Sequence, residues 1–341
     1  MAQTVLITGA TGFIATYVIK LLLEQDYIVI GTVRTMEKGD NFVKNFQNDN
    51  FSYVIVPDLT DSKQHFEQIL QSHPEIEIVL HTASPVFPRY YKDAEQDLIL
   101  PAINGTKNLL ESVTKYGLNV KRLVYTSSDS AIHSVNREGQ NLVENEDSWN
   151  DVEWVRGNSK DIDAVTGYDV SKTYTEREVW EYSSKNPNVK VSVINPAYVF
   201  GPQLFDETVH ELNYSSDLLG SLVTNGNGDD YKRLKGGFID VRDVAKAHLF
   251  AFQRDNTINK RLFLNETTFT EQTLLDIVNA KFPSLHDKVP KGVPGSDKET
   301  LRESFTVFDN TKTKEILDFE FISLEQGVFD TIDQIIKVKG I

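Results

Sequence analysis

The sequence predicts an α/β protein in which a doubly wound parallel sheet is joined to a smaller C-terminal lobe. Short apolar runs rich in β-branched residues alternate with stretches whose apolar residues recur at helical spacing, as in successive βαβ units. The first run, Val5–Ile7, ends at a glycine turn, and a helical pattern begins at Phe13. At 341 residues the chain exceeds one typical core, which favours a large domain and a smaller one.

The turn after the first predicted strand has the glycine spacing of a dinucleotide site. It reads T-G-x-x-G-x-x-A. Gly9 allows the backbone to turn, and Gly12 allows phosphates to approach the N–H groups and positive dipole end of the next helix. An ordinary strand-to-helix turn is the alternative. The residues of this turn that we expect to bind a cofactor in a Rossmann-type fold are Gly9, Thr11, Gly12, Phe13 and Ile14.

The end of the second predicted strand, at 27–33, indicates which dinucleotide binds. An NAD site places Asp or Glu there for the ribose 2′-hydroxyl, whereas NADP needs a cation for the 2′-phosphate. This chain has Arg34, with Lys38 four residues further on. The sequence therefore favours NADPH, and two solvated surface cations are the alternative.

Two further strands, predicted at 52–56 and 77–81, also end in residues suited to a cofactor. Asp58 and Leu59 follow the first, and Thr82-Ala83-Ser84 follows the second. Small residues at a strand end leave room for ribose and phosphates, although a tight turn also uses them.

An aromatic loop at 87–91 precedes a helix predicted at 97–116. Ligands bind at the carboxyl edge of open α/β sheets, so Phe87 is a candidate wall of a substrate pocket. A packing anchor is the alternative role for such a residue.

Tyr168 and Lys172 are spaced to lie on one face of a helix, after a strand predicted at 122–126 that leads into Thr126-Ser127-Ser128. Tyrosine has a pKa of about 10, and an ammonium beside it stabilises the phenolate and so lowers the pKa of the tyrosine. A neighbouring serine hydroxyl can polarise a carbonyl. The same Y-x-x-x-K spacing at Tyr231 and Lys235 follows no serine-bearing strand, and we interpret it as coincidence.

Several longer phrases resemble one family. The glycine turn is similar to that of the extended short-chain dehydrogenases/reductases. The helix phrase with Glu176 and Trp180 resembles the dihydroflavonol and cinnamoyl-CoA reductase group. Within that group, the chain most resembles the fungal branch of NADPH-dependent methylglyoxal and 3-methylbutanal reductases, and the phrases at 195–203 and 238–245 are also similar to those of that branch. The matching phrases run from residue 4 to about residue 250.

This resemblance implies a catalytic set of Ser128, Tyr168 and Lys172, with Ser127 as the alternative serine. The implied reaction is hydride transfer from NADPH to the carbonyl carbon of an aldehyde or ketone. Ser128 donates a hydrogen bond to the developing oxyanion and Tyr168 gives it a proton. Lys172 lowers the pKa of the tyrosine and holds the nicotinamide ribose.

The resemblance also extends the expected cofactor and substrate sites. An Asp at the position of Asp58 accepts from the adenine amino group in this superfamily. Asp129 and Tyr198 are candidate substrate-pocket residues, and the carboxylate of Asp129 departs from the small or aromatic residue more often found there. The expected NADPH-binding residues beyond the glycine turn are Arg34, Lys38, Asp58, Leu59, Thr82, Ala83, Ser84, Thr126, Pro196 and Val199.

We expect a dinucleotide-binding domain at 1–200 and 238–266 and a substrate-binding lobe at 201–237 and 267–341. The polar insert at 131–167 is too long for a plain connector, and we expect part of it to act as a lid.

Composition limits the partners and the compartment. A net charge of −15 argues against nucleic acid and anionic membrane surfaces, and the absence of cysteine excludes disulfides and thiolate sites. The seven histidines have no metal-ligand spacing, so we expect no metal. Met1 leads directly into the first strand, and no apolar run has membrane length. We therefore expect a cytoplasmic protein. The resemblance implies a small carbonyl compound as its substrate, and we expect a monomer or homodimer.

Two alternatives share parts of this pattern. An NAD-dependent sugar-nucleotide epimerase or dehydratase would use the same catalytic residues, but Arg34 argues against NAD. A non-catalytic dinucleotide sensor would need the glycine turn but not Ser128, Tyr168 and Lys172.

Overall fold

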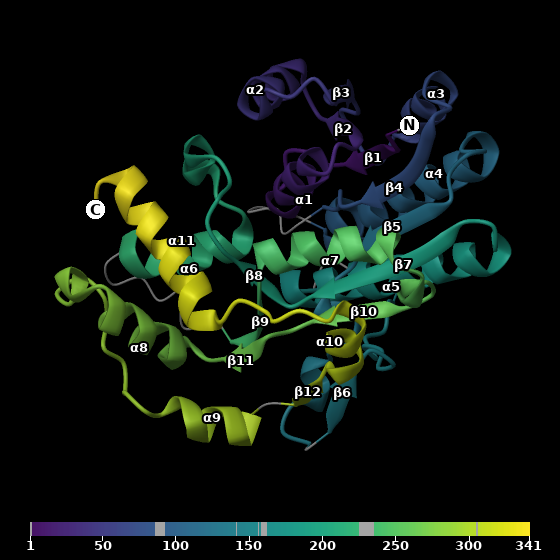
Figure 1. Cartoon of the computed structure of the whole chain (residues 1–341). Helices are drawn as coiled ribbons and strands as arrows, with labels where there is room; N and C mark the ends of the chain where they lie inside the picture. Colours follow the sequence, from purple (N-terminus) through teal and green to yellow (C-terminus); the bar gives the residue numbers. More distant parts are fainter. Residues whose placement is uncertain are drawn as a thin grey trace. The chain divides into compact units, whose positions relative to one another are not determined.

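The computed structural model describes residues 2–85, 93–140, 142–155, 157, 162–224, 235–304 and 306–341. The chain divides into two compact units (Figure 1). The first comprises 1–134, 147–195 and 245–262, and the second comprises 135–146, 196–244 and 263–341.

The first unit is built on a seven-stranded sheet with the order β10-β7-β5-β4-β1-β2-β3. Every neighbouring pair from β3 to β7 is parallel, so the predicted doubly wound sheet is confirmed. The strands are β1 (Thr4–Thr8), β2 (Ile28–Val33), β3 (Phe51–Ile55), β4 (Ile76–His81), β5 (Arg122–Thr126), β7 (Lys190–Pro196) and β10 (Arg261–Leu264).

Strand order reverses between β1 and β4, which lie side by side although two strands separate them in sequence. β1 continues to β2 and β3 in one direction, and β4 continues to β5 and β7 in the other. In open sheets of this kind ligands bind beyond the carboxyl ends of the strands at this reversal. The glycine turn and the Thr82–Ser84 segment both lie there.

Helices flank the sheet, and α3, α4 and α5 pack in sequence beside one another. Between these helices and the sheet lies a core that includes Phe66, Leu109, Tyr125 and Val179, all fully or almost fully buried. A π-helical segment, Glu95–Ile99, leads into α4 within the predicted helix at 97–116. The helices are α1 (Phe13–Glu24), α2 (Met36–Phe46), α3 (Lys63–Ser72), α4 (Leu100–Tyr116), α5 (Ala164–Lys185) and α7 (Val241–Gln253), which begins in the second unit.

The second unit has its own core around a three-stranded sheet of order β11-β9-β8. Buried Phe200, Phe238 and Phe269 come one from each strand. A two-stranded sheet joins β6 to β12. The strands and helices of the second unit are β6 (Val143–Asn145), β8 (Tyr198–Phe200), β9 (Gly236–Asp240), β11 (Thr267–Phe269), β12 (Val307–Asp309), α6 (Tyr214–Thr224), α8 (Glu271–Lys281), α9 (Asp297–Ser304), α10 (Thr311–Leu317) and α11 (Leu324–Lys339).

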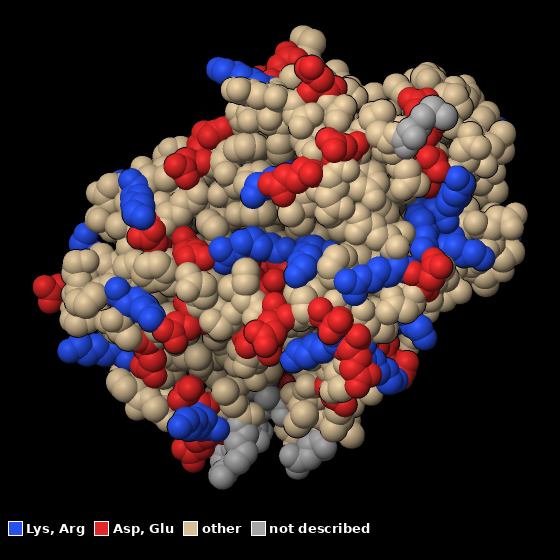
Figure 2. All heavy atoms as spheres, in the orientation of Figure 1, with Lys and Arg blue, Asp and Glu red and all other residues tan. Residues whose placement is uncertain are grey.

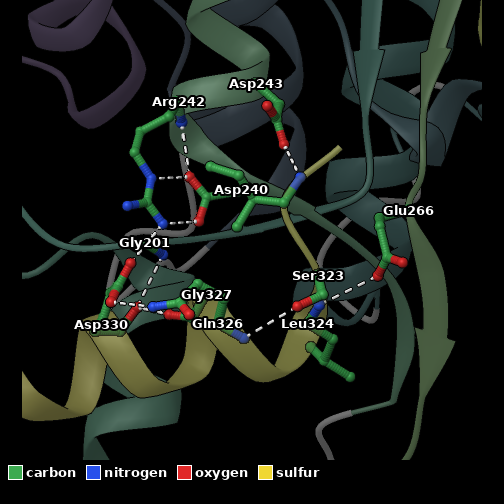
Figure 3. A network of polar contacts seen from close by, with 12 residues as sticks. Gly201, Asp240, Arg242, Asp243, Glu266, Ser323, Leu324, Gln326, Gly327 and Asp330 are labelled. Carbon is green, nitrogen blue, oxygen red and sulfur yellow. Dashed lines mark hydrogen bonds and ion pairs between the residues drawn. The ribbon is translucent and has the colours of Figure 1, made fainter. Parts of the chain in front are cut away.

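A polar network ties α11 to the end of β9 (Figure 3). The Arg242 guanidinium forks onto the buried Asp240 carboxylate at 2.8 and 2.7 Å and also pairs with Asp330 of α11 at 2.7 Å. The Asp243 carboxylate accepts from the backbone N–H of Ile322, just before α11. The same Arg–Asp fork raises the pKa of Arg242, so this link carries charge at any physiological pH.

The domain boundaries expected from the sequence stay a prediction. In the two compact units, Pro196–Val244 falls in the second unit, where β8 and β9 pair with each other. Residues 263–266 also fall there, although β10 of the seven-stranded sheet ends at Leu264. Residues 135–146 belong there as well because β6 pairs with β12. Of the predicted insert at 131–167, therefore, only part belongs to the first unit.

The charged residues do not segregate by sign on the face seen in Figure 2, where Lys and Arg side chains are interspersed with Asp and Glu. Among the described residues, every helix is too short or too polar to cross a bilayer.

Candidate active site

The β1–α1 turn presents backbone N–H groups rather than side chains. Gly9 has φ +68°, a conformation that glycine adopts without strain, and its N–H donates to Thr32 Oγ1 at 3.0 Å. A Cβ on Gly12 would lie 3.1 Å from the Gly9 carbonyl oxygen. α1 begins without a side-chain cap and has no acidic residue in its first turn. The first N–H groups of a helix have no intrahelical partners, so this turn fits a pyrophosphate.

Arg34 follows β2 directly and is exposed, as is Lys38 in the first turn of α2. The pKa of the nearby Asp58 carboxyl is lowered, first by hydrogen bonds from the Thr60 N–H and hydroxyl and then by the charge of Arg34. Arg34 therefore lies near the loop after β3, where an adenosine ribose would lie in this fold. A cation in this place fits a 2′-phosphate.

The carboxyl ends of β1 and β4 are held together by hydrogen bonds. The Thr82 hydroxyl donates to the Thr8 carbonyl at 2.5 Å, and the Ala83 N–H donates to Thr8 Oγ1 at 3.1 Å. Thr8 Oγ1 also lies 2.7 Å from His81 Nδ1, whose ring is buried. Burial, and next the charge of Lys172, lower the pKa of His81 to about 3, so this ring is neutral and structural.

β5 and α5 bring Ser128, Tyr168 and Lys172 together. The Ser128 hydroxyl is hydrogen-bonded to Tyr168, donates to Asp129 Oδ1 at 3.0 Å and accepts from the Ser130 N–H at 3.2 Å. Lys172 Nζ lies 5.6 Å from the centroid of the Tyr168 ring and 3.4 Å from the Thr126 carbonyl oxygen. The four-residue spacing on α5 places the phenol and the ammonium on one face of the helix.

Burial dominates the protonation of this group. It raises the pKa of Tyr168 above the ordinary tyrosine value, and the Asp129 and Asp169 carboxylates raise it further, while the hydrogen bond with Ser128 lowers it. Burial lowers the pKa of Lys172 to about 8. The pKa of Tyr168 is therefore raised and not lowered as the sequence-based argument expected, because desolvation is the largest contribution to it.

Burial also shifts the pKa of Asp169, the residue next to Tyr168. Desolvation raises the pKa of its carboxyl to about 7, Asp129 raises it further, and hydrogen bonds with Ser130 and Asn150 lower it. Two carboxyl groups thus lie close to the tyrosine.

Sequence reasoning missed a buried polar cluster behind Ser128. Glu176, one turn after Lys172 on α5, is fully buried and accepts hydrogen bonds from Ser127 Oγ at 2.6 Å and Asn195 Nδ2 at 2.7 Å. It also forms an ion pair with Arg261 of β10 at 2.6 Å. The sequence shows that Glu176 lies four residues after Lys172, but it does not show that Glu176 has a partner on β10.

The other predicted residues lie in several environments. The Thr126 hydroxyl is paired with buried His248 at 2.7 Å. Leu59 follows β3, and Ser84 Oγ donates to its neighbour's carbonyl, Pro85 O, at 3.3 Å. Tyr198 packs edge-on against Phe269 in the core of the second unit. Pro196 and Val199 also belong to that unit, whereas Phe87 and Tyr231 lie outside the described residues.

No group of three or more His, Asp or Glu side chains that could hold a metal ion occurs in the part of the chain that the structure describes.

Comparisons with known proteins show which family and which reductases the chain is similar to. Residues 5–264 match the model of the NAD dependent epimerase/dehydratase family. The chain is 43% identical over 346 residues to the NADPH-dependent methylglyoxal reductase GRE2 of Saccharomyces cerevisiae, with 99% of each chain covered. The crystal structure of Gre2 from Candida albicans in complex with NADPH superposes with a TM-score of 0.93 at 42% identity, covering 98% of this chain and 99% of that one. Yeast methylglyoxal/isovaleraldehyde reductase Gre2 complexed with NADPH gives the same TM-score and identity, with 99% of each chain covered.

Proposed function

We infer that this chain, which belongs to the NAD dependent epimerase/dehydratase family, is an NADPH-dependent reductase that converts an aldehyde or ketone to the alcohol. Its substrates are small carbonyl compounds of the methylglyoxal, 3-methylbutanal, diketone or aryl ketone type. The relatives at 42–43% identity are named or crystallised as NADPH-dependent methylglyoxal reductases, which supports this class. The observation that carries the proposal is the hydrogen-bonded pair of Ser128 and Tyr168 with Lys172 beside the phenol ring.

Tyr168 is the proton donor in this mechanism. Its raised pKa keeps the phenol protonated at neutral pH, so a proton is available for the oxygen of a carbonyl that is being reduced. Ser128 adds a second hydrogen bond to that oxygen, for which its hydroxyl turns from Asp129 towards the substrate.

Lys172 stabilises the phenolate that Tyr168 becomes after proton transfer. With a pKa of about 8, its amine is mostly an ammonium at neutral pH. A cation 5.6 Å from the ring centroid favours the charged form of the phenol. When bound, NADPH supplies the hydride.

The β1–α1 turn and Arg34 hold the cofactor in this proposal. Gly9 and Gly12 shape the turn, the uncapped start of α1 offers N–H groups to the pyrophosphate, and Arg34 with Lys38 binds the 2′-phosphate. Asp58 accepts from the adenine amino group. The first unit then binds NADPH, and the second unit supplies the substrate-binding residues, including Tyr198 and the nicotinamide-lining Pro196 and Val199.

We further propose that the protein acts in the cytoplasm as a monomer or homodimer. The absence of cysteine and the net charge of −15 support a reducing compartment without nucleic acid partners.

The test is the loss of NADPH absorbance with purified protein and a panel of methylglyoxal, 3-methylbutanal, a diketone and an aryl ketone. We expect oxidation of NADPH in preference to NADH. Oxidation of neither cofactor by any carbonyl compound would overturn the proposal. Tightly bound NAD that copurifies would instead favour a sugar-nucleotide epimerase.

A further inference from the structure

The cluster behind Ser128 is built around one fully buried carboxylate. Glu176 accepts from four side chains: Ser127 Oγ at 2.6 Å, Asn195 Nδ2 at 2.7 Å, Trp180 Nε1 at 3.0 Å and Arg261 Nε at 2.6 Å. Burying a carboxylate is costly unless its oxygen atoms are paired, and here they are. So complete a set of donors fixes the position of Glu176 on α5.

Arg261 extends the cluster to the segment that follows Ser128. Its guanidinium donates to the Ala131 carbonyl at 3.1 Å and to the Ser148 carbonyl, and it lies 4.2 Å from the Trp149 ring centroid. The Arg261 side chain is 7% exposed and that of Glu176 is not exposed at all. The ion pair therefore joins β10, α5 and both ends of the loop between 131 and 148.

Asn195 connects the cluster to the serine itself. Its amide Nδ2 donates both to Glu176 and to the backbone carbonyl of Ser128 at 3.0 Å. Ser127 is held by its side chain on the same carboxylate. The backbone that carries Ser128 is thus fixed on either side of the residue by groups bound to Glu176.

The charge of Glu176 also acts on Lys172, one turn earlier on the same face of α5. Burial lowers the pKa of Lys172 and Glu176 raises it, giving a value of about 8. The other groups facing the ammonium are the Tyr168 ring, the Thr126 carbonyl and His81, whose pKa of about 3 leaves it neutral. Arg261 forms an ion pair with Glu176.

We propose that Glu176 and Arg261 are positioning residues for the reductase reaction: together they fix the backbone around Ser128, and the Glu176 carboxylate places a negative charge one turn of α5 from Lys172. This inference rests on the proposed function, since it assigns these residues a part in that reaction. It gives two separable expectations, one geometric and one electrostatic.

The test compares Glu176→Gln with wild type in kcat, KM and NADPH binding by fluorescence between about pH 6 and about pH 9. Lys172 loses its proton as pH rises through its pKa. Removing the Glu176 carboxylate lowers this pKa, so the fall of kcat on the alkaline side of its pH profile (the alkaline limb) should move to lower pH. A shift of one unit lowers the protonated fraction of Lys172 at pH 8 about fivefold and hardly changes it at pH 6. Misplacement of Ser128 lowers kcat at every pH, while the affinity for NADPH at pH 6 stays unchanged.

Three variants complete the design. Glu178→Gln is the matched control, because Glu178 lies on the same helix and forms an ion pair with Lys107 at 2.8 Å, and we expect its profile to equal that of wild type. Glu176→Asp retains the charge and should restore the wild-type alkaline limb. The double variant Glu176→Gln/Arg261→Met leaves no unpaired buried charge, and it replaces the single variant if that does not fold.

The outcomes separate the two proposals. Wild-type protein that reduces no carbonyl compound overturns the proposed function. Active wild type together with an unshifted alkaline limb and unchanged kcat in the foldable Glu176 variant overturns this inference alone. If kcat of the Glu176 variant is lowered equally at every pH and its alkaline limb is not shifted, the electrostatic effect of Glu176 on Lys172 is overturned.

Discussion

The β1–α1 turn and the β5–α5 site lie at the carboxyl ends of strands in one sheet, yet they are built in opposite ways. The turn uses backbone geometry: Gly9 at φ +68° and the uncapped start of α1. The β5–α5 site uses side chains whose pKa values the fold shifts: desolvation raises the pKa of Tyr168 and lowers that of Lys172, and neighbouring carboxylates act on both.

The difference shows what kind of change each region tolerates. In the proposed function the start of α1 binds the cofactor through backbone N–H groups, which side-chain substitution elsewhere does not remove. In the β5–α5 site, each buried charge is held by partners, so the loss of one changes the proton affinity of the next. We therefore expect cofactor binding and turnover to respond to different substitutions.

Tyr168→Phe should give the largest effect, because it removes the proton donor and leaves the ring. We expect kcat to fall by about a thousandfold or more, a typical scale for loss of a general acid in such a site. NADPH binding by fluorescence titration should be unchanged, since the β1–α1 turn is untouched. Thr173→Ser, a small change at a buried position of the same helix, serves as a control expected to keep wild-type kcat. Retained turnover in Tyr168→Phe would contradict the catalytic assignment.

The sequence predicted most of the fold and the residue types of the site. Glycine spacing and apolar periodicity are local, so the turn at Gly9–Gly12 and the alternation of strands and helices in βαβ units could be predicted directly. The boundary of the second unit could not, because it depends on β8 pairing with β9 and β6 with β12. Strand pairing over such distances leaves no local signal.

The pKa values of the β5–α5 site could not be predicted from the sequence either. The Tyr168–Lys172 spacing indicates an ammonium near a phenol, but the pKa of Tyr168 depends on how much water the fold excludes and on Asp129 and Asp169. The Glu176–Arg261 ion pair joins residues 85 positions apart. Only the packed structure brings these two charges together.

Asp169→Asn should have an effect between those of Tyr168→Phe and Arg34→Ala. It tests how much the burial of a carboxyl group in the β5–α5 site lowers the free energy of unfolding. The folded pKa of Asp169 is about 7, against 3.8 for an exposed Asp, so the folded state keeps a proton that the unfolded chain releases. Stability therefore falls as pH rises from about 4 to about 7. Asn does not titrate, so the variant should gain roughly 4 kcal/mol relative to wild type between about pH 4 and about pH 8.

Urea unfolding of both proteins at these two pH values measures this gain. Asp49→Asn, which removes an exposed carboxylate from the same unit, should show the same pH dependence as wild type. An Asp169→Asn variant whose stability differs from wild type by the same amount at both pH values would contradict the burial of a proton at Asp169.

Arg34→Ala should have the smallest effect and acts on the cofactor side of the comparison. Arg34 is exposed at the end of β2, and its loss removes a charge-assisted fork to a 2′-phosphate that NADH lacks. We expect the ratio of kcat/KM for NADPH to that for NADH to fall about 10- to 30-fold, equal to about 1.4 to 2 kcal/mol. Lys44→Ala removes an exposed cation from the last turn of α2 and should leave that ratio unchanged. Since Arg34 touches no group of the β5–α5 site in this proposal, kcat at saturating NADPH should stay within about twofold of wild type. A large fall in that kcat would mean that cofactor binding and proton transfer are coupled, and the contrast between the two regions would not hold.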